Sequence, residues 1–402
     1  MASNLPKGWL GRVSKHETHG IVFLVMGAGL VTLARAMTLS FLAIKLHRTF
    51  ALDPATIGFL LGLGPLIGAF VVPFAGSLSD RTGRKAALSL ILIVLALATV
   101  ALGIAETVVA FCLAQCVAAV AIAVYGPISR ALMSDMCAES ARLKYFSWRY
   151  TASNMGWAIG PLLGIAAGVV STPLFLSAAA VYATLALALQ LLVLPPMIGA
   201  GDDISFRPAQ VTESLKAAMQ DPRLLFFIGG GTALVAVYGQ WTATLAPYLA
   251  RDIGGGVEIF AYLVSVNGIV VLSGNPLARR FIERRGALSA LVIGAFLLVV
   301  SQIGFSVSVD LAGFIISMVA FTIGEILVVP SEYVLVDGIS RSGNRGSYYG
   351  AHSFSTIGSF IGPTLGGAVL GTLGGTAMFL LFAVFATVGA IFYAAGKASS
   401  QW

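Results

Sequence analysis

The sequence is poor in charged residues, and this deficit narrows the class of protein. Charged residues make up only 10% of its 402 positions, whereas a soluble globular protein carries about 25%. Hydrophobic residues make up 58%, and the mean hydropathy is +0.93. A chain of this composition is predicted to be an integral membrane protein.

Cysteine and the common catalytic signatures are also scarce. Cys112 and Cys116 fall inside an apolar run, so we expect no structural disulfide, and their spacing with Cys137 does not match a metal site. The sequence contains no G-x4-G-K-[ST] phosphate loop, no H-E-x-x-H and no G-x-S-x-G. We therefore expect no enzyme activity, no catalytic residues, no metal and no cofactor, and we do not expect ATP to be the energy source.

Long apolar runs are what the sequence has in abundance. At about 20 residues a span, only helices satisfy the backbone of such runs in lipid. We predict an all-α membrane protein with twelve transmembrane helices. Residues 1–20 lack the features of a cleaved signal peptide, so the first span is expected to be retained. The runs lie near 20–44, 55–78, 86–105, 107–129, 145–170, 172–194, 224–249, 258–278, 287–307, 311–336, 348–371 and 375–396.

The basic residues are distributed unevenly about these runs. The net charge is +7, but most of the 24 Lys and Arg residues lie on one side of the predicted bundle, and Lys45, Arg48 and Arg251 lie on the other. Lys and Arg favour the cytoplasmic side. The pattern predicts a multi-pass protein of the plasma (inner) membrane with both termini cytoplasmic. The bilayer, rather than nucleic acid, is the expected partner of these charges.

The longest polar segment divides the chain. It spans 195–223, opens with two prolines and ends in an amphipathic stretch at 212–220 that is suited to the membrane surface. We predict a six-helix bundle over 1–194, a cytoplasmic linker over 195–223 and a second six-helix bundle over 224–402.

The two predicted bundles repeat each other in sequence. The stretch NMGWAIGPLLG at 154–164 matches TIGSFIGPTLG at 356–366, at an offset of 202 residues. Pro127 matches Pro330, and the loop residues Asp80 and Gly83 match Glu283 and Gly286, at an offset of 203. Agreement between three separate segments predicts a duplication that yields pseudo-symmetric halves.

The first copy of that loop, GSLSDRTGRK at 76–85, lies between two apolar runs. Gly83 can supply the turn, and the basic residues can hold it in the cytoplasm. The loop resembles the motif G-x-L-[AS]-D-R-x-G-R-[KR] between helices two and three of the major facilitator superfamily. The resemblance implies that superfamily's fold over the whole chain. It also implies a conformational switch formed by Gly76, Asp80, Arg81, Gly83 and Arg84.

A second motif lies in the fifth predicted span. Gly156, Gly160, Pro161 and Gly164 resemble the pattern G-x3-G-P-x2-G of the drug:proton antiporter branch of that superfamily. Pro161 frees a carbonyl and bends the helix, and we expect the glycines to let it press on a partner helix from the other half. In the family this contact closes one side of the cavity, so the resemblance implies an exporter.

Two charges are expected to lie deep in the membrane, where each costs several kcal/mol unless it is paired or wetted. Glu325 follows a glycine, as an acidic residue does in the tenth span of bacterial multidrug antiporters. A carboxyl in a low-dielectric cavity favours its neutral form, so Glu325 can load and release a proton. The fourth-span motif R-x-x-Q-G of many proton-coupled members is missing at 112–116. Arg35 either replaces its charge or binds an anionic substrate group.

Other charges are expected near the cytoplasmic ends of the helices. We predict that they form interhelical salt bridges, although Arg149 is also a candidate for contacting an anionic substrate. These residues are Arg130, Asp135, Arg149, Glu332 and Asp337.

In the family that this chain resembles, helices one, four, seven and ten line a central cavity. Aromatic residues beside a few polar groups suit amphiphilic substrates. The alternative for each aromatic residue is packing or anchoring at the interface, and for His352 a hydrogen-bonded core position. The substrate-binding candidates are Arg35, Tyr125, Arg149, Tyr150, Tyr238, Gln240, Trp241, Glu325 and His352.

The leading functional hypothesis is a monomeric secondary active transporter that exports a small amphiphilic molecule by proton antiport with alternating access. The proton gains about 2.3 kcal/mol per 100 mV of membrane potential. The substrate is either a lipophilic, often cationic, drug or an anionic metabolite such as a siderophore. One alternative is a proton-coupled importer. The other is a transport-inactive sensor, which would have packed, salt-bridged charges and no cavity.

Overall fold

The computed structural model describes residues 7–137, 139–193, 218–239, 241–339 and 345–398. Side chains are described throughout these ranges except at 7–18 and at scattered positions within 73–82, 134–147 and 345–350. The described residues are helices joined by short turns, with no strand among them. Ten of the described helical stretches are long and apolar enough to cross a membrane. This confirms the all-α membrane class, and the count of twelve spans stays a prediction.

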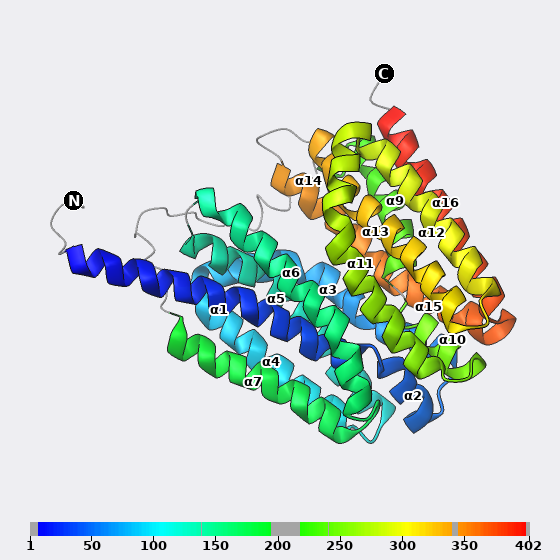
Figure 1. The fold of residues 1–402 in the computed structure, drawn as a ribbon, viewed down its shortest axis with the longest axis horizontal. Coiled ribbons are helices and arrows are strands. Elements are labelled where there is room, and N and C mark those ends of the chain that lie inside the picture. Colours follow the sequence, from blue (N-terminus) through cyan, green and yellow to red (C-terminus); the bar gives the residue numbers. More distant parts are fainter. Residues whose placement is uncertain (1–6, 138, 194–217, 240, 340–344, 399–402) are drawn as a thin grey trace.

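The helices form two groups along the chain (Figure 1). The first group is α1 Lys7–Leu39, α2 Leu42–Phe50, α3 Pro54–Thr82, α4 Arg84–Ile104, α5 Val108–Met136, α6 Glu139–Ala166 and α7 Thr172–Leu192. The second is α9 Pro222–Tyr238, α10 Leu245–Asp252, α11 Gly256–Arg285, α12 Ala287–Val307, α13 Leu311–Ile339, α14 Arg345–His352, the 3₁₀ turn η1 Ser353–Ile357, α15 Gly358–Leu373 and α16 Gly375–Ala398.

Three of the predicted spans are interrupted. The first breaks between α1 and α2, the seventh between α9 and α10, and the eleventh passes through α14 and η1 before α15 begins. Apolar periodicity alone did not reveal these breaks, because each lies within a long apolar run of the sequence. The first and seventh spans occupy the same place in each group, so their breaks are a further sign of the repeat.

Glycine makes the turn in both copies of the loop motif. Gly83 joins α3 to α4 with φ +89°, and Gly286 joins α11 to α12 with φ +81°. A Cβ at either position would meet no atom within 4 Å. The glycine is therefore required by the backbone conformation rather than by space. The predicted role of Gly83 as the turn residue is confirmed.

A buried lysine closes the end of α4. The Lys45 ammonium donates to the carbonyls of Leu102 and Gly103 at 2.8 and 3.1 Å, and it lies 4.3 Å from the centre of the Phe175 ring. The last carbonyls of a helix lack partners within the helix and carry partial negative charge. Lys45 therefore holds α2, α4 and α7 together. It lies at the end of the bundle opposite to most of the basic residues, as the sequence predicted.

The glycine face of α6 packs against α1. A Cβ on Gly156 would come within 2.6 Å of the Gly29 carbonyl, and one on Gly160 within 2.6 Å of the Ala36 Cβ. In the second group, Gly358 and Gly362 of α15 meet α9 in the same way. We expected this face of α6 to press on the other half, and that was wrong. Small residues on α1 let it fit the glycines within its own group.

Contacts between the groups lie elsewhere. They join α3 to α15, α6 to α11 and α2 to α10. Phe59 meets Phe360 at 5.8 Å between ring centroids, and the Ser265 hydroxyl donates to the Ala158 carbonyl at 2.7 Å. A Cβ on Gly268 would lie 2.9 Å from that of Ala158. These contacts bind the two groups along one part of their length.

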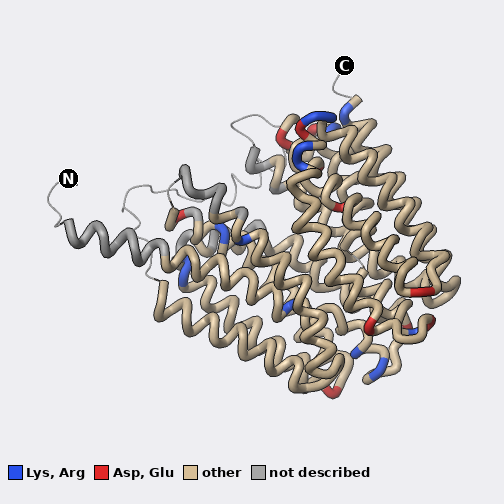
Figure 2. Tube along the Cα trace, viewed as in Figure 1, with Lys and Arg blue, Asp and Glu red and all other residues tan. Residues whose placement is uncertain are grey.

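The groups converge toward one end and diverge toward the other (Figure 1). We call the end with the start of α1, the turn at Gly83 and the end of α16 the terminal end. The distal end holds the α2–α3 and α10–α11 connections, where α2 contacts α10. Figure 2 shows that charged residues gather at the two ends, with few between them.

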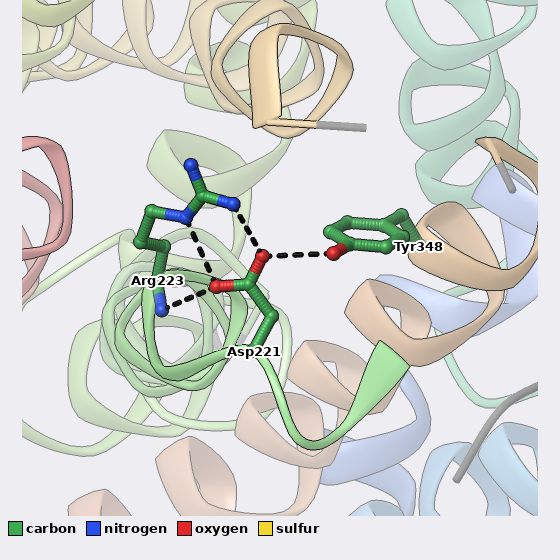
Figure 3. Close-up of polar contacts among 3 residues, drawn as sticks. All are labelled: Asp221, Arg223 and Tyr348. Carbon is green, nitrogen blue, oxygen red and sulfur yellow. Dashed lines mark hydrogen bonds and ion pairs between the residues drawn. The ribbon is translucent and has the colours of Figure 1, made fainter. Parts of the chain in front are cut away.

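A carboxylate organises the start of α9 at the terminal end (Figure 3). Asp221 accepts hydrogen bonds from the Arg223 amide at 2.9 Å and its Nη2 at 2.8 Å, and from the Tyr348 hydroxyl at 2.8 Å. Burial by itself raises the pKa of Asp221. The hydrogen bonds and the Arg223 charge outweigh it, so this pKa lies below its ordinary value. Asp221 therefore caps α9 and ties α14 to it.

Substituting Gly160 by Ala should lower the free energy of unfolding by about 1–3 kcal/mol, because the added methyl group forces α1 and α6 apart. Gly27→Ala is the matched control, since its Cβ would lie 3.8 Å from the nearest atom. Thermal unfolding of the purified protein in detergent measures both variants. Equal unfolding temperatures for both variants would contradict the close contact.

Substituting Asp221 by Asn should lower the free energy of unfolding by about 1–2 kcal/mol at pH 7. Because the folded-state pKa is lowered, this stabilisation is present above the unfolded value near pH 4 and is lost as the pH falls through the folded value. The wild type and variant should therefore converge in acid. Asp310→Asn is the control, since Asp310 caps the Gly313 amide without a described cation. A difference that persists in acid would exclude a charge effect.

Candidate functional site

A cavity of about 1050 Å³ lies between the two groups of helices. Its wall includes residues of α1, α3, α5 and α6 on one side and of α11, α13, η1 and α15 on the other. Small and apolar residues form most of the wall. Its main polar and aromatic residues are Arg35, Gln115, Arg130, Tyr150, Asn154, Trp157, Tyr182, Trp241, Asn267, Asn275, Glu325 and Tyr333.

Glu325 is the one acidic residue among the described residues of this wall. It lies on α13, and its carboxylate accepts a hydrogen bond from the Asn267 amide of α11 at 3.1 Å. The same amide donates to the Thr322 hydroxyl at 3.0 Å. No described Lys or Arg lies within ion-pair distance of Glu325. The carboxyl is thus held in place by neutral groups, which accept either of its protonation states.

Asn267 was missed by the sequence reasoning. It is 8% exposed and lies within an apolar run, where an amide must find a partner. A polar residue in the middle of a predicted span was the signal that could have identified it.

Arg35 lies on the opposite wall, on α1. Its guanidinium carbon is 5.8 Å from the centre of the Trp157 ring of α6. Trp157 in turn meets Trp241 of the second group at 6.0 Å between ring centroids. Among the described residues, Arg35 has no carboxylate partner. The predicted positions of Arg35 and Trp241 at the cavity are confirmed, and Trp157 is an addition.

Tyr150 also lines the cavity and crosses the interface. Its hydroxyl accepts a hydrogen bond from the Asn275 amide, which joins α6 to α11. The Ser265 hydroxyl also joins these two helices, through the Ala158 carbonyl. Tyr150 therefore combines a place in the wall with a contact between the groups.

Two of the candidates in the first group lie behind the wall. Tyr125 is 6% exposed and is buried in the apolar core, because α5 turns its Gln115 and Gly126 face to the cavity instead. Arg149 donates to the Ser129 hydroxyl at 3.3 Å. Neither residue lines the cavity in this conformation, so the structure does not support direct contact with a substrate here.

Tyr238 and His352 belong to a buried network in the second group. The Tyr238 hydroxyl donates to Glu332 at 3.2 Å, and the His352 Nε2 lies 2.9 Å from the Tyr393 hydroxyl. Tyr393 also interacts with Glu332. His352 is therefore a hydrogen-bonded core residue, which was the alternative for it. Neither Tyr238 nor His352 lines the cavity, and Gln240 lies outside the described residues.

The salt bridges predicted at the helix ends are confirmed at Asp135, whereas Arg149 and Glu332 have other partners. Asp135 pairs with Arg84 at 2.5 Å and joins α5 to α4. Glu332 contacts tyrosines instead of a cation, and Asp337 accepts from the Tyr349 hydroxyl at 3.1 Å. Arg149 bonds a serine. Arg130 lines the cavity and has no described ion-pair partner. Hydroxyl groups thus contact Arg149 and Glu332, and Arg130 faces the cavity.

The loop motif is described only in part. Arg84 reaches Asp135, and Gly83 forms the turn. The side chains of Asp80 and Arg81, and Gly76, lie outside the described residues. In the second copy, Glu283 pairs with Arg279 of its own helix at 2.8 Å.

Known proteins share this arrangement. The sequence-family model of the Major Facilitator Superfamily matches residues 24–356. The chain belongs to the Major Facilitator Superfamily. Members of this superfamily are transporters rather than enzymes, and they act on small molecules. The expected family is therefore confirmed.

Similar proteins extend over nearly the whole chain. The uncharacterized MFS-type transporter YqjV of Bacillus subtilis is 28% identical over 370 residues, 91% of this chain and 90% of that protein. YdeE of Escherichia coli, also an uncharacterized MFS-type transporter, is 25% identical over 384 residues, 94% and 96% of the two chains. The multidrug resistance protein MdtH of Klebsiella pneumoniae is 23% identical over 358 residues, which cover 89% of this chain and 87% of that protein.

Solved structures show the same fold. A bacterial homologue of the human lysosomal transporter Spinster, in an inward-facing and unoccupied conformation, matches with TM-score 0.74 and 17% identity over 95% of this chain and 96% of that one. The nucleoside transporter NupG matches with TM-score 0.77 and 16% identity over 95% and 99%. At these identities the likeness shows the fold alone.

A cysteine placed in the cavity wall should react with a membrane-impermeant maleimide. Ser153 lines the cavity, whereas Ser301 is fully buried in α12 and donates to the Leu298 carbonyl. In a background without native cysteines, Ser153→Cys should be labelled at least tenfold faster than Ser301→Cys. The time course of labelling by mass spectrometry measures both rates. Equal rates would show that water does not fill the cavity.

Proposed function

We propose that this protein exports a small amphiphilic organic molecule by proton antiport. One observation carries the proposal: Glu325 faces a large cavity between the two groups of helices and has no described cation as partner. A carboxyl in such a place can bind a proton from whichever side the cavity faces and release it to the other. The MFS family membership supports transport, and the relative named as a multidrug resistance protein supports export.

Alternating access is the proposed mode of action. The contacts between the groups join α3 to α15, α6 to α11 and α2 to α10, while the groups diverge toward the terminal end (Figure 1). Rocking of one group on the other would close the terminal end and open the distal end. The proposed division is 1–194, 195–223 and 224–402, in a monomer of the plasma (inner) membrane with both termini cytoplasmic. The cavity then faces the cytoplasm.

The glycine motif contributes to this motion in a different way from the one expected. Because Gly156 and Gly160 join α6 to α1 within one group, they make that group rigid. A rigid group rocks as a unit. The proposed switch consists of Gly76, Asp80, Arg81, Gly83, Arg84, Gly156, Gly160, Pro161 and Gly164.

The two alternative functions are a transport-inactive sensor and uptake by proton symport. A transport-inactive sensor requires packed, salt-bridged charges and no central cavity, and the cavity of about 1050 Å³ with Arg35 and Glu325 in its wall argues against it. Uptake by proton symport uses the same fold, and the nucleoside transporter NupG shares it. The direction of substrate flux relative to the proton flux distinguishes antiport from symport.

Substituting Glu325 by Gln should abolish proton-driven transport. Glutamine resembles the protonated acid but releases no proton, so an imposed pH gradient can no longer drive the substrate. The assay uses proteoliposomes under an imposed pH gradient, with ethidium and dansyl-lysine as the probes, and thermal unfolding checks that the variant is folded. We expect at least a tenfold loss of gradient-driven transport.

Glu258→Gln is the matched control, because Glu258 lies in the first turn of α11 at the distal end and outside the cavity. It should transport as the wild type does. Gradient-driven transport by Glu325→Gln at the wild-type rate would exclude Glu325 from proton coupling. A substrate flux in the same direction as the proton flux would replace antiport by symport.

A further inference from the structure

Two ionisable residues of the cavity wall, Arg35 and Glu325, lie on opposite sides. Arg35 belongs to α1 of the first group, and Glu325 to α13 of the second. Arg130 adds a further positive charge on the first group's wall. Among the described lining residues, the first group therefore supplies positive charge and the second group supplies the negative charge. A molecule bound between them meets a cationic wall and an acidic wall at once.

We infer that Arg35 with Trp157 and Trp241 forms an anion subsite, and that the substrate is an amphiphilic zwitterion with its oxyanion at Arg35 and its amine at Glu325. The inference rests on the proposed function and names the chemical class of its substrate. Each pole of the zwitterion meets a residue that lacks a described partner of opposite charge.

The cost of burying Arg35 supports the anion subsite. A charged arginine in the middle of a membrane is costly unless it is paired or in contact with water. Among the described residues, no carboxylate offsets this cost for Arg35, and none of them accepts a hydrogen bond from it. Its guanidinium is therefore available to the cavity. The planar N–H fork of arginine suits a carboxylate, which it can bind through two parallel hydrogen bonds.

Trp157 fixes the guanidinium in place. The ring lies 5.8 Å from the guanidinium carbon, a distance at which a cation is attracted to the face of an indole. A contact with the ring face uses none of the N–H groups of the guanidinium, so they remain free for an anion. Arg35 is therefore held before a ligand arrives, which reduces the entropy lost on binding.

The tryptophans also provide a surface for an apolar body. Trp241 meets Trp157 at 6.0 Å between ring centroids and both line the cavity, so an aromatic surface runs from Arg35 into the second group. The cavity volume of about 1050 Å³ is at the upper end of the range for pockets that hold drug-sized ligands. A hydrocarbon or aromatic body of that size fits beside the charged poles.

The sign of the coupling favours a zwitterion over either ion alone. Antiport requires that proton and substrate compete, and an amine competes with a proton for the Glu325 carboxylate. A substrate with only an anionic group would bind better once Glu325 is neutral, which is the sign expected for symport. A lipophilic cation without an oxyanion would satisfy Glu325 but would face Arg35 and Arg130. Only the zwitterion satisfies both walls and competes with the proton.

Three probes with one fluorophore and similar chains test the inference. Nε-dansyl-lysine is zwitterionic, dansyl-cadaverine has only the amine, and dansyl-aminohexanoate has only the carboxylate. Energy transfer from tryptophan to dansyl measures equilibrium binding to the full-length protein in detergent at pH 7. We expect dansyl-lysine to bind at least tenfold more tightly than either of the other two.

Variants of Arg35 and Glu325 show which residue binds the carboxylate of the probe and which binds its amine. Arg35→Gln should weaken dansyl-lysine about tenfold without weakening dansyl-cadaverine, whereas Glu325→Gln should weaken both amines without weakening dansyl-aminohexanoate. Arg48→Gln, an exposed residue near the distal end, should bind as the wild type does. Thermal unfolding checks that each variant is folded, and Arg35→Lys, which keeps the charge, should recover part of the affinity for dansyl-lysine.

Several results would overturn the inference. These are tighter binding of dansyl-cadaverine than of dansyl-lysine, equal binding of dansyl-aminohexanoate, no binding of dansyl-lysine up to 1 mM, or an equal loss for all three probes in Arg35→Gln. The measurement uses no gradient, so it is independent of proton coupling. If Glu325→Gln loses gradient-driven transport but dansyl-lysine binds no more tightly than the other probes, this inference is refuted and the antiport proposal stands. If dansyl-lysine binds more tightly but Glu325→Gln keeps gradient-driven transport, the antiport proposal is refuted and this inference stands.

Discussion

A polar group in the hydrocarbon core of a bilayer has no water to pair with, and this constraint shapes the whole molecule. It forces the backbone into helices, and it forces each charge to a helix end, to a hydrogen-bond partner or to the cavity. Lys45 is buried because it can reach two carbonyls at the end of α4. Arg35 and Glu325 reach no such charged partner among the described residues, and both line the space between the groups. The candidate site is therefore the part of the structure where charged residues without a described ion-pair partner line the cavity.

Properties that depend on composition and local geometry could be predicted from the sequence. The membrane class follows from long apolar runs, and the turn at Gly83 follows from a glycine between basic residues. Glu325 and Arg35 were identifiable because a lone charge within a predicted span has few structural explanations. These predictions needed no knowledge of which helices are neighbours.

Predictions that depended on the identity of a neighbour failed. The glycines of α6 indicated a close contact, but nothing in them specified α1 as the partner. Tyr125 was assigned to the cavity because its helix lines it, yet the helix turns another face inward. Glu332 was expected to pair with a cation and instead meets Tyr238. A tyrosine within an apolar run is an ordinary core residue in sequence, so its hydroxyl gave no signal of that role.

The two kinds of helix contact have different consequences for how such a chain can change over generations. The contacts of α6 with α1 and of α15 with α9 are each confined to one group of helices. A substitution there can therefore be compensated within that group. The contact between α3 and α15 joins the two groups, as at Phe59 and Phe360. A substitution on one side of it must be tolerated by the other, so this surface is the more tightly constrained of the two.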